Sequence, residues 1–127
     1  MNMKVLLING SPRREGNTFL ALSEVAKTLN ECGVETDIEW IGVKAMHGCN
    51  ACGVCKTSGQ CVFRDELMER MEQKVTWCDG IIVGSPVYYA GPNGFLCAFL
   101  DRLFYSQGRH LRWRCAGVVG RVPPSTA

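Results

Sequence analysis

Short apolar runs separated by polar stretches predict alternating strands and helices in the first half of the chain. Residues 3–9, MKVLLIN, are almost continuously apolar, which is typical of a central parallel strand covered on both faces. After Thr18, apolar residues recur at helical spacing, and Gly33 is a suitable residue to end that helix. Residues 34–42, VETDIEWIG, alternate between polar and apolar positions and predict a second strand.

The second half of the chain repeats this alternation. Asp65 is suited to N-cap a helix that follows it, and residues 79–86, DGIIVGSP, predict a buried strand that ends at Pro86. A third helix is expected over 93–106, and residues 115–120, CAGVVG, predict a fourth strand. The order βαβαβαβ predicts an α/β fold built on a doubly wound parallel sheet.

This topology indicates where functional residues should lie. Because crossovers between parallel strands are right-handed, the loops that follow the strands meet at one edge of the sheet. We therefore expect three loops, 10–18, 42–64 and 85–93, to lie side by side at that edge.

Composition narrows the class of protein. The chain has 127 residues, of which 46% are hydrophobic and 20% charged, so we expect a single globular domain over 1–127. The net charge is only +2, with acidic and basic residues interspersed, which gives no electrostatic basis for binding nucleic acid or a membrane. The apolar run near the N-terminus is too short for a signal peptide, and no segment reaches membrane-spanning length. We expect a cytoplasmic protein.

The first loop, NGSPRREGNT, follows the opening strand directly and is rich in hydrogen-bonding groups. Polar side chains come from Ser11, Asn17 and Thr18. A positive charge comes from Arg13 or Arg14, and backbone N–H groups come from the start of the next helix. The loop lacks the Lys-Ser ending of a nucleotide-hydrolysing P-loop and the three-glycine dinucleotide motif. It therefore predicts a phosphate monoester site without magnesium, a helix-capping turn being the alternative.

The third loop, in GSPVYYAGPNGFLCAFLDR, carries two tyrosines, glycines and Asn93. Aromatic rings and exposed amides at this edge can pack on a flat heteroaromatic ring and bind its polar rim. The alternative is that Tyr88 and Tyr89 cover the core. Adjacent strand residues point in opposite directions, so this alternative suits one tyrosine better than both.

Four of the eight cysteines form the compact run C-x2-C-x2-C-x5-C, at Cys49, Cys52, Cys55 and Cys61. In a reducing compartment, clustered cysteines are typical of metal or redox chemistry rather than disulfides. Compact runs of this kind ligate cubane clusters in ferredoxins. Structural zinc usually joins two separated cysteine pairs, and free thiols in a loop are a further alternative. The residues alone leave the ligand open.

Together the three motifs resemble those of the NAD(P)H-dependent FMN reductase family of flavodoxin-like proteins, and its iron–sulfur flavoprotein branch in particular. The resemblance extends from about residue 3 to residue 106. It implies that the first motif binds the FMN phosphate, through Ser11, Arg13, Asn17 and Thr18. It also implies that the third motif lies along the isoalloxazine and ribityl chain, through Pro86, Val87, Tyr88 and Asn93.

The resemblance implies an oxidoreductase that passes electrons from NAD(P)H through bound FMN to an unidentified small-molecule or redox-protein acceptor. Because the flavin supplies the chemistry, no catalytic side chain is expected. The alternative implied by the same family is an iron–sulfur flavoprotein electron carrier with no nicotinamide site of its own. In that case the resemblance implies a [4Fe–4S] cluster ligated by Cys49, Cys52, Cys55 and Cys61.

The end of the chain departs from the family pattern. Relatives continue through a flavin-contacting loop, a fifth strand and a last helix, which the last ~15 residues here do not resemble. We therefore expect a flavodoxin-like FMN-binding domain that is truncated after the fourth strand and lacks the usual C-terminal strand and helix. An open sheet edge leaves backbone and apolar groups to be covered, so a homodimer or higher homo-oligomer is expected.

Overall fold

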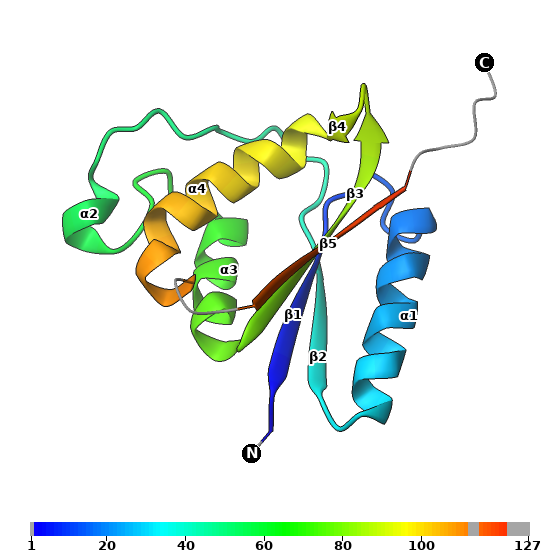
Figure 1. Ribbon diagram of the computed structural model, residues 1–127. Helices are drawn as coiled ribbons and strands as arrows, with labels where there is room; N and C mark the ends of the chain where they lie inside the picture. The colour runs from blue at the N-terminus through cyan, green and yellow to red at the C-terminus, as the bar shows by residue number, and fades with distance from the viewer. Residues whose placement is uncertain (1, 112–114, 122–127) are drawn as a thin grey trace.

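The computed structural model describes residues 2–111 and the backbone of residues 115–121 (Figure 1). Its elements are β1 (Lys4–Asn9), α1 (Asn17–Glu31), β2 (Glu35–Trp40), α2 (Cys55–Ser58), α3 (Glu66–Trp77), β3 (Gly80–Tyr88), β4 (Gly91–Pro92), α4 (Gly94–Leu111) and β5 (Cys115–Arg121). Parallel ladders give the order β2-β1-β3-β5, and β4 pairs antiparallel with the end of β3. The predicted α/β fold with a doubly wound parallel sheet is confirmed.

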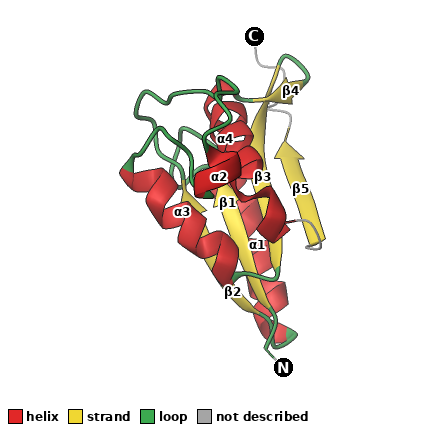
Figure 2. Cartoon of the chain, turned by 90° about the vertical axis from the view of Figure 1, so that its left-hand side faces the viewer, coloured by secondary structure: helices red, strands yellow, loops and turns green. Residues whose placement is uncertain are grey.

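The sheet is covered on both faces, which explains the continuous apolar run of β1. Val5 and Leu7 pack against Leu22 and Ala26 of α1. The alternate residues of β1 face the other side, where α3 and α4 lie (Figure 1). Figure 2 shows α2, α3 and α4 in front of the sheet and α1 behind it. The larger core is on the α3–α4 side and includes Leu6, Ile8, Met68, Met71, Val75, Leu96, Phe99 and Leu103.

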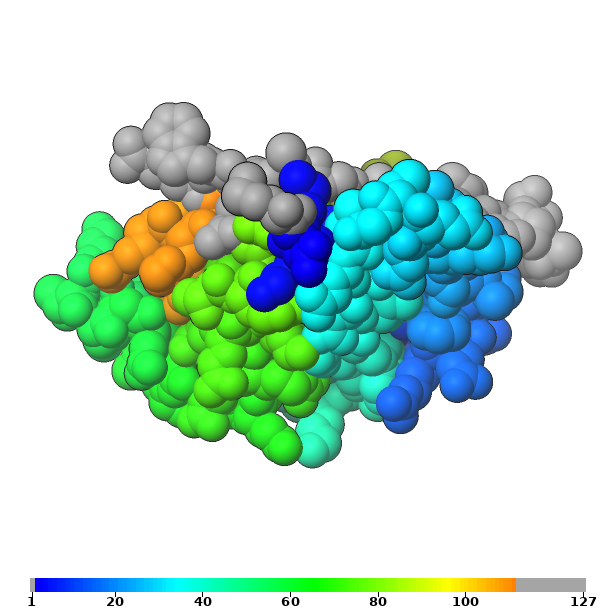
Figure 3. Space-filling view, turned by 90° about the horizontal axis from the view of Figure 1, so that it is seen from below, coloured from blue at the N-terminus to red at the C-terminus, as the bar shows by residue number. Residues whose placement is uncertain are grey.

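The edge at which the strands begin carries none of the three loops discussed above. Seen from this edge, the first residues lie between the α1–β2 connection, in cyan, and the end of α3 with the start of β3, in green (Figure 3). The N–H of Glu35 donates to the carbonyl of Met3, and that of Asp79 to the carbonyl of Lys4. No helix of the described residues is long and apolar enough to cross a bilayer.

Helix boundaries follow the local sequence signals. Asp65 is the N-cap of α3, as predicted, and its Oδ1 accepts from the N–H of Met68 at 2.7 Å. Gly33 follows the end of α1 with a φ of +82°, the left-handed conformation that favours glycine. At the start of α1, Gly16 occupies the cap position and no side chain caps the helix.

The third strand is longer than predicted, because Pro86 does not end it. Proline has no N–H, so it ends a strand only where the pairing with the neighbouring strand requires a hydrogen bond from that position. Here β3 continues as a hairpin in which Val87 pairs with Pro92 and Tyr88 with Gly91. Helix α4 also extends beyond its predicted end. The expectation that no strand or helix follows concerns residues 122–127, which lie outside the described residues.

We predict that Gly84→Ala destabilises the protein, because α1 lies directly on this strand residue. An added Cβ would lie 2.8 Å from Thr18 Cγ2 and 2.9 Å from Leu22 Cδ1. Such overpacking should lower the free energy of unfolding by about 1–3 kcal/mol, measured by urea denaturation.

Gly108→Ala is the matched control, because it adds the same methyl group to α4 where, among the described residues, no atom outside the helix backbone and the neighbouring residues lies within 4 Å. This change should leave stability unchanged or raise it by up to about 1 kcal/mol. Equal stability of the two variants would contradict the close packing of α1 on β3.

Candidate functional site

A hollow of about 250 Å³ lies at the carboxyl edge of the sheet, between the loop after β1 and the end of β3. Its lining residues are Ser11, Pro12, Arg13, Asn17, Thr18, Pro86 and Tyr88. We call it the phosphate-loop pocket. The structure thus brings together six of the eight residues that the family resemblance assigned to FMN. Val87 and Asn93 do not line it.

Hydrogen bonds within the loop shape one side of this pocket. The N–H of Ser11 donates to Asn9 Oδ1 at 3.0 Å, and the N–H of Arg13 donates to Ser11 Oγ at 3.1 Å. In the part of the chain that the structure describes, no acceptor meets the N–H groups of Asn17 and Thr18. The first turn of α1 therefore presents free N–H groups and the positive end of the helix dipole, which together favour an anion.

The two neighbouring arginines have different surroundings. Arg13 is exposed and lines the phosphate-loop pocket. Arg14 lies over Trp40, with its Cζ 5.6 Å from the ring centroid. The indole N–H of Trp40 also donates to the carbonyl of Ser11 at 2.8 Å. The charge at the pocket therefore comes from Arg13, the arginine that the family resemblance indicated and that the residues alone did not distinguish from Arg14.

Trp40 was not predicted as part of this region. Its position follows from the parallel pairing of β1 with β2, in which Asn9 lies opposite Trp40. The sequence feature that could have predicted this position is a tryptophan at the end of the strand that pairs with β1.

Asn93 holds the pocket together from behind. Its side chain is almost completely buried, and its Nδ2 donates to the carbonyl of Gly10 at 2.6 Å. Its Oδ1 accepts from the N–H of Leu96 at 3.3 Å and so caps α4, while its own N–H donates to Ser85 Oγ. Both the nitrogen and the oxygen of the amide thus bind protein groups. Asn93 positions the loops after β1 and β3 rather than facing the pocket.

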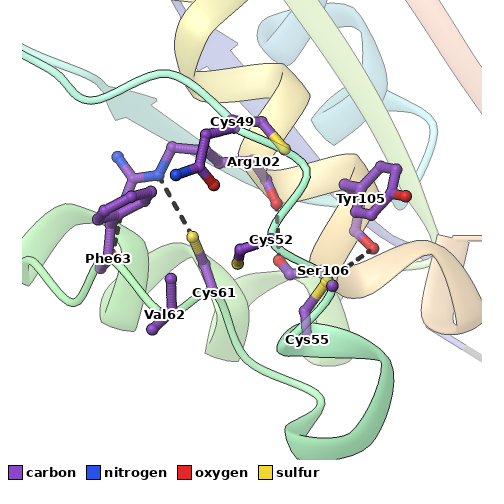
Figure 4. Close-up of a pocket in the computed structure, with 11 residues that line it drawn as sticks. Cys49, Cys52, Cys55, Cys61, Val62, Phe63, Arg102, Tyr105 and Ser106 are labelled. Atoms are coloured by element: carbon purple, nitrogen blue, oxygen red, sulfur yellow. Dashed lines mark hydrogen bonds between the residues drawn. The ribbon is translucent and has the colours of Figure 1, made fainter.

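The four clustered cysteines line a second hollow, which we call the cysteine pocket (Figure 4). Cys55 and Cys61 are buried, whereas Cys49 and Cys52 are exposed. The hollow measures about 20 Å³, room for about one water molecule. Within the described residues, no three His, Cys, Asp or Glu side chains are gathered closely enough to hold a metal ion. The thiols surround one space without meeting in it.

Arg102 of α4 anchors the loop over residues 42–64, which carries the four clustered cysteines and which we call the cysteine loop. The side chain of Arg102 is only 1% exposed. Its guanidinium donates to Cys61 Sγ at 3.4 Å, the carbonyl of His47 at 3.2 Å, the carbonyl of Phe63 at 2.6 Å and Asp65 Oδ2 at 3.0 Å. Burial lowers the pKa of this guanidinium, but the hydrogen bonds to Cys61 and Asp65 outweigh burial and leave the pKa above its ordinary value. The group is therefore a buried positive charge.

Sequence reasoning missed Arg102, although helical periodicity contains the signal. Phe99, three residues before it, and Ser106, four residues after it, are both buried on α4. Residues at these spacings share one face of a helix, so Arg102 lies on the buried face.

The path of the cysteine loop differs from the prediction that residues 42–64 lie wholly beside the other two loops. The N–H of Ile41 still donates to the carbonyl of Asn9 at the carboxyl edge. Farther on, Gln107 Nε2 donates to the carbonyl of Gly59 at 2.9 Å, and Arg102 binds the segment around Cys61. These contacts draw the loop along α4 (Figure 1). The two pockets share no lining residue.

The fold is that of a flavodoxin-like protein. Residues 3–125 match the family described as NADPH-dependent FMN reductase, and the chain belongs to that family, in its iron–sulfur flavoprotein branch.

Two curated relatives are iron–sulfur flavoproteins from archaea. One, from Methanocaldococcus jannaschii, is 41% identical over 100 residues, which cover 79% of this chain and 51% of the relative. Another, from Archaeoglobus fulgidus, is 37% identical over 118 residues, which cover 92% of this chain and 53% of the relative. The chain thus spans about half the length of these relatives.

The solved structure of an NAD(P)H:quinone oxidoreductase from Methanothermobacter marburgensis superposes with a TM-score of 0.64 at 14% sequence identity. The superposition covers 82% of this chain and 54% of that one. At this identity the similarity concerns the fold, and it confirms the flavodoxin-like architecture.

We predict that Asn93→Ala destabilises the protein. It leaves the buried carbonyl of Gly10 without its donor, which should cost about 1–3 kcal/mol, and removes the α4 cap, which should cost about 1 kcal/mol more. Asn93→Ser keeps an oxygen for the cap and should recover part of this loss in urea denaturation. Wild-type stability of Asn93→Ala would show that the two loops are held by other contacts.

Proposed function

We propose that the chain binds FMN in the phosphate-loop pocket and acts as an oxidoreductase that passes electrons through this flavin. The observation that supports the proposal is the uncapped first turn of α1 beside Ser11, Arg13 and Thr18. Free N–H groups, hydroxyls and a guanidinium are the donors that a phosphate dianion prefers. When bound, FMN supplies the transfer of a hydride or of single electrons.

The side chains around the pocket suit the two ends of such a ligand. The methyl group of Thr18 lies toward Gly84 of β3, and its hydroxyl has no protein partner among residues 2–111. That hydroxyl is therefore available to a phosphate oxygen. On the opposite wall, Pro86 and the half-exposed Tyr88 present flat, largely apolar surfaces suited to the rest of the flavin.

We assign NAD(P)H as the electron donor on the basis of the family, which is described as NADPH-dependent. No side chain needs to transfer a proton for this step, because the cofactors carry the chemistry. We further propose that the chain forms a homodimer or a higher homo-oligomer.

The cysteine pocket supports a second redox group, a [4Fe–4S] cluster held by Cys49, Cys52, Cys55 and Cys61. All four thiols line one hollow, and the two relatives described above are named iron–sulfur flavoproteins. The donor set fits the cluster, whereas the space is too small as it stands. We propose that room comes from the exposed segment carrying Cys49 and Cys52, because the other two thiols are buried. Such a cluster supplies single-electron transfer.

We predict that Arg13→Gln weakens FMN binding, because it removes hydrogen bonds to the charged phosphate. Each such bond is worth about 1.5–3 kcal/mol, so affinity should fall by about 10- to 100-fold in fluorescence titrations. Riboflavin, which lacks the phosphate, should bind both proteins equally.

Arg14→Gln is the matched control, since Arg14 lies over Trp40 and outside the pocket. It should leave FMN affinity unchanged. Equal losses in the two variants, or an equal loss for riboflavin, would place the phosphate elsewhere.

We predict that Cys52→Ala abolishes the cluster and spares the flavin, because the two pockets share no lining residue. Iron and acid-labile sulfide should be lost from anaerobically prepared protein, while FMN content is retained. Cys32→Ala, an exposed cysteine just after α1, should change neither. Equal iron and sulfide in both variants would remove Cys52 from the ligand set, and loss of FMN would show that the two sites are one.

A further inference from the structure

Arg102 is the one charged residue among the described residues that line the cysteine pocket. Figure 4 shows its guanidinium directed at the sulfur of Cys61. A buried cation is costly unless anionic groups compensate for it. Its carboxylate partner, Asp65, is 46% exposed, so solvent screens part of that compensation.

Cys61 is held firmly on the buried side of the pocket. Its N–H donates to Glu72 Oε1 at 3.3 Å, and Glu72 is itself paired with Arg64 at 2.8 Å. The contact between Arg102 and Cys61 therefore lies on the fixed wall. Cys49 and Cys52, by contrast, are exposed.

A hydrogen bond to a cysteine sulfur that ligates an iron–sulfur cluster favours the reduced state, because reduction adds negative charge to the cluster and its sulfurs. A fixed positive charge next to that sulfur acts in the same direction. In a buried site, both effects are larger than in water.

We propose that Arg102 is a positioning residue that raises the reduction potential of a cluster held by the cysteine pocket, through its charge and its hydrogen bond to Cys61, and that Asp65 limits this effect. The inference rests on the proposed function, in which the four cysteines hold the cluster. Each reduction adds one electron to the cluster, and dithionite supplies that electron in the test described below.

Substitution of Asp65 distinguishes an electrostatic role of Arg102 from a purely structural one. Its Oδ1 caps α3, and its Oδ2 accepts from Arg102. Asp65→Asn keeps an oxygen for the cap and removes the negative charge beside the guanidinium. More of the positive charge of Arg102 then acts on Cys61. The two substitutions, at Arg102 and at Asp65, should therefore shift the potential in opposite directions.

The experiment is a potentiometric titration of the cluster-loaded full chain, followed by EPR, with the FMN potential recorded in the same samples. Arg102→Gln should lower the cluster potential by about 59 mV or more, which for one electron corresponds to a tenfold or greater fall in the equilibrium constant for reduction. Asp65→Asn should raise it. Arg102→Lys keeps the charge without the planar fork and should fall between Arg102→Gln and wild type.

Lys27→Gln removes one exposed positive charge from α1, on the other face of the sheet, and should change nothing. Unchanged cluster potentials in the Arg102 variants, or shifts of Arg102→Gln and Asp65→Asn in the same direction, would overturn the proposal. If Arg102→Gln does not fold, a raised potential in Asp65→Asn supports the proposal and an unchanged one overturns it. Wild-type protein that holds no iron or sulfide would overturn the proposed cluster itself, which distinguishes the two failures.

Discussion

The hydrogen bond from Asn93 Nδ2 to the carbonyl of Gly10, at 2.6 Å, joins the two loops on which the phosphate-loop pocket depends. The N–H of the same Gly10 donates to the carbonyl of Gly84 at 2.8 Å, so the first residue after β1 is fixed on both sides. These bonds set the position of the start of α1 relative to Pro86 and Tyr88. The free N–H groups of α1 can then face a ligand without being closed off by the neighbouring loop.

Much of this edge could be predicted from the sequence, because local patterns carried the necessary information. The continuous apolar run of β1 indicated a strand buried on both faces, and the polar residues after it indicated where a phosphate could bind. The role of Asn93 could not be predicted in the same way. Its amide is engaged by a carbonyl 83 residues away, and residue type alone does not show that a loop asparagine faces the protein instead of a ligand.

The path of the cysteine loop could not be predicted from the sequence, for a different reason. Strand order fixes where a loop begins and ends, but the path between depends on contacts with other elements. Here Gln107 and Arg102 of α4 hold the loop well away from the phosphate-loop pocket. Arg102 was overlooked because a charged residue is normally expected on the exposed side of a helix, although its spacing from Phe99 placed it on the buried one.

The two pockets differ in how completely the protein alone builds them. Around the phosphate-loop pocket, hydrogen bonds between loops fix the donors in advance, which favours binding of a ligand of defined shape. In the cysteine pocket two thiols are buried and two are exposed, and Ala51 and Gly53, beside the exposed cysteines, have left-handed φ values of 59° and 79°. The protein thus buries half of the cysteine set and leaves the other half exposed.

The most direct test of flavin binding at the α1 terminus is the visible spectrum of anaerobically purified protein, with the released flavin identified by chromatography. We predict yellow protein with the absorption bands of oxidised flavin, and release of FMN rather than riboflavin at about one per chain, because the anchoring groups are those of a phosphate site. Colourless protein that remains colourless after incubation with FMN would contradict this function.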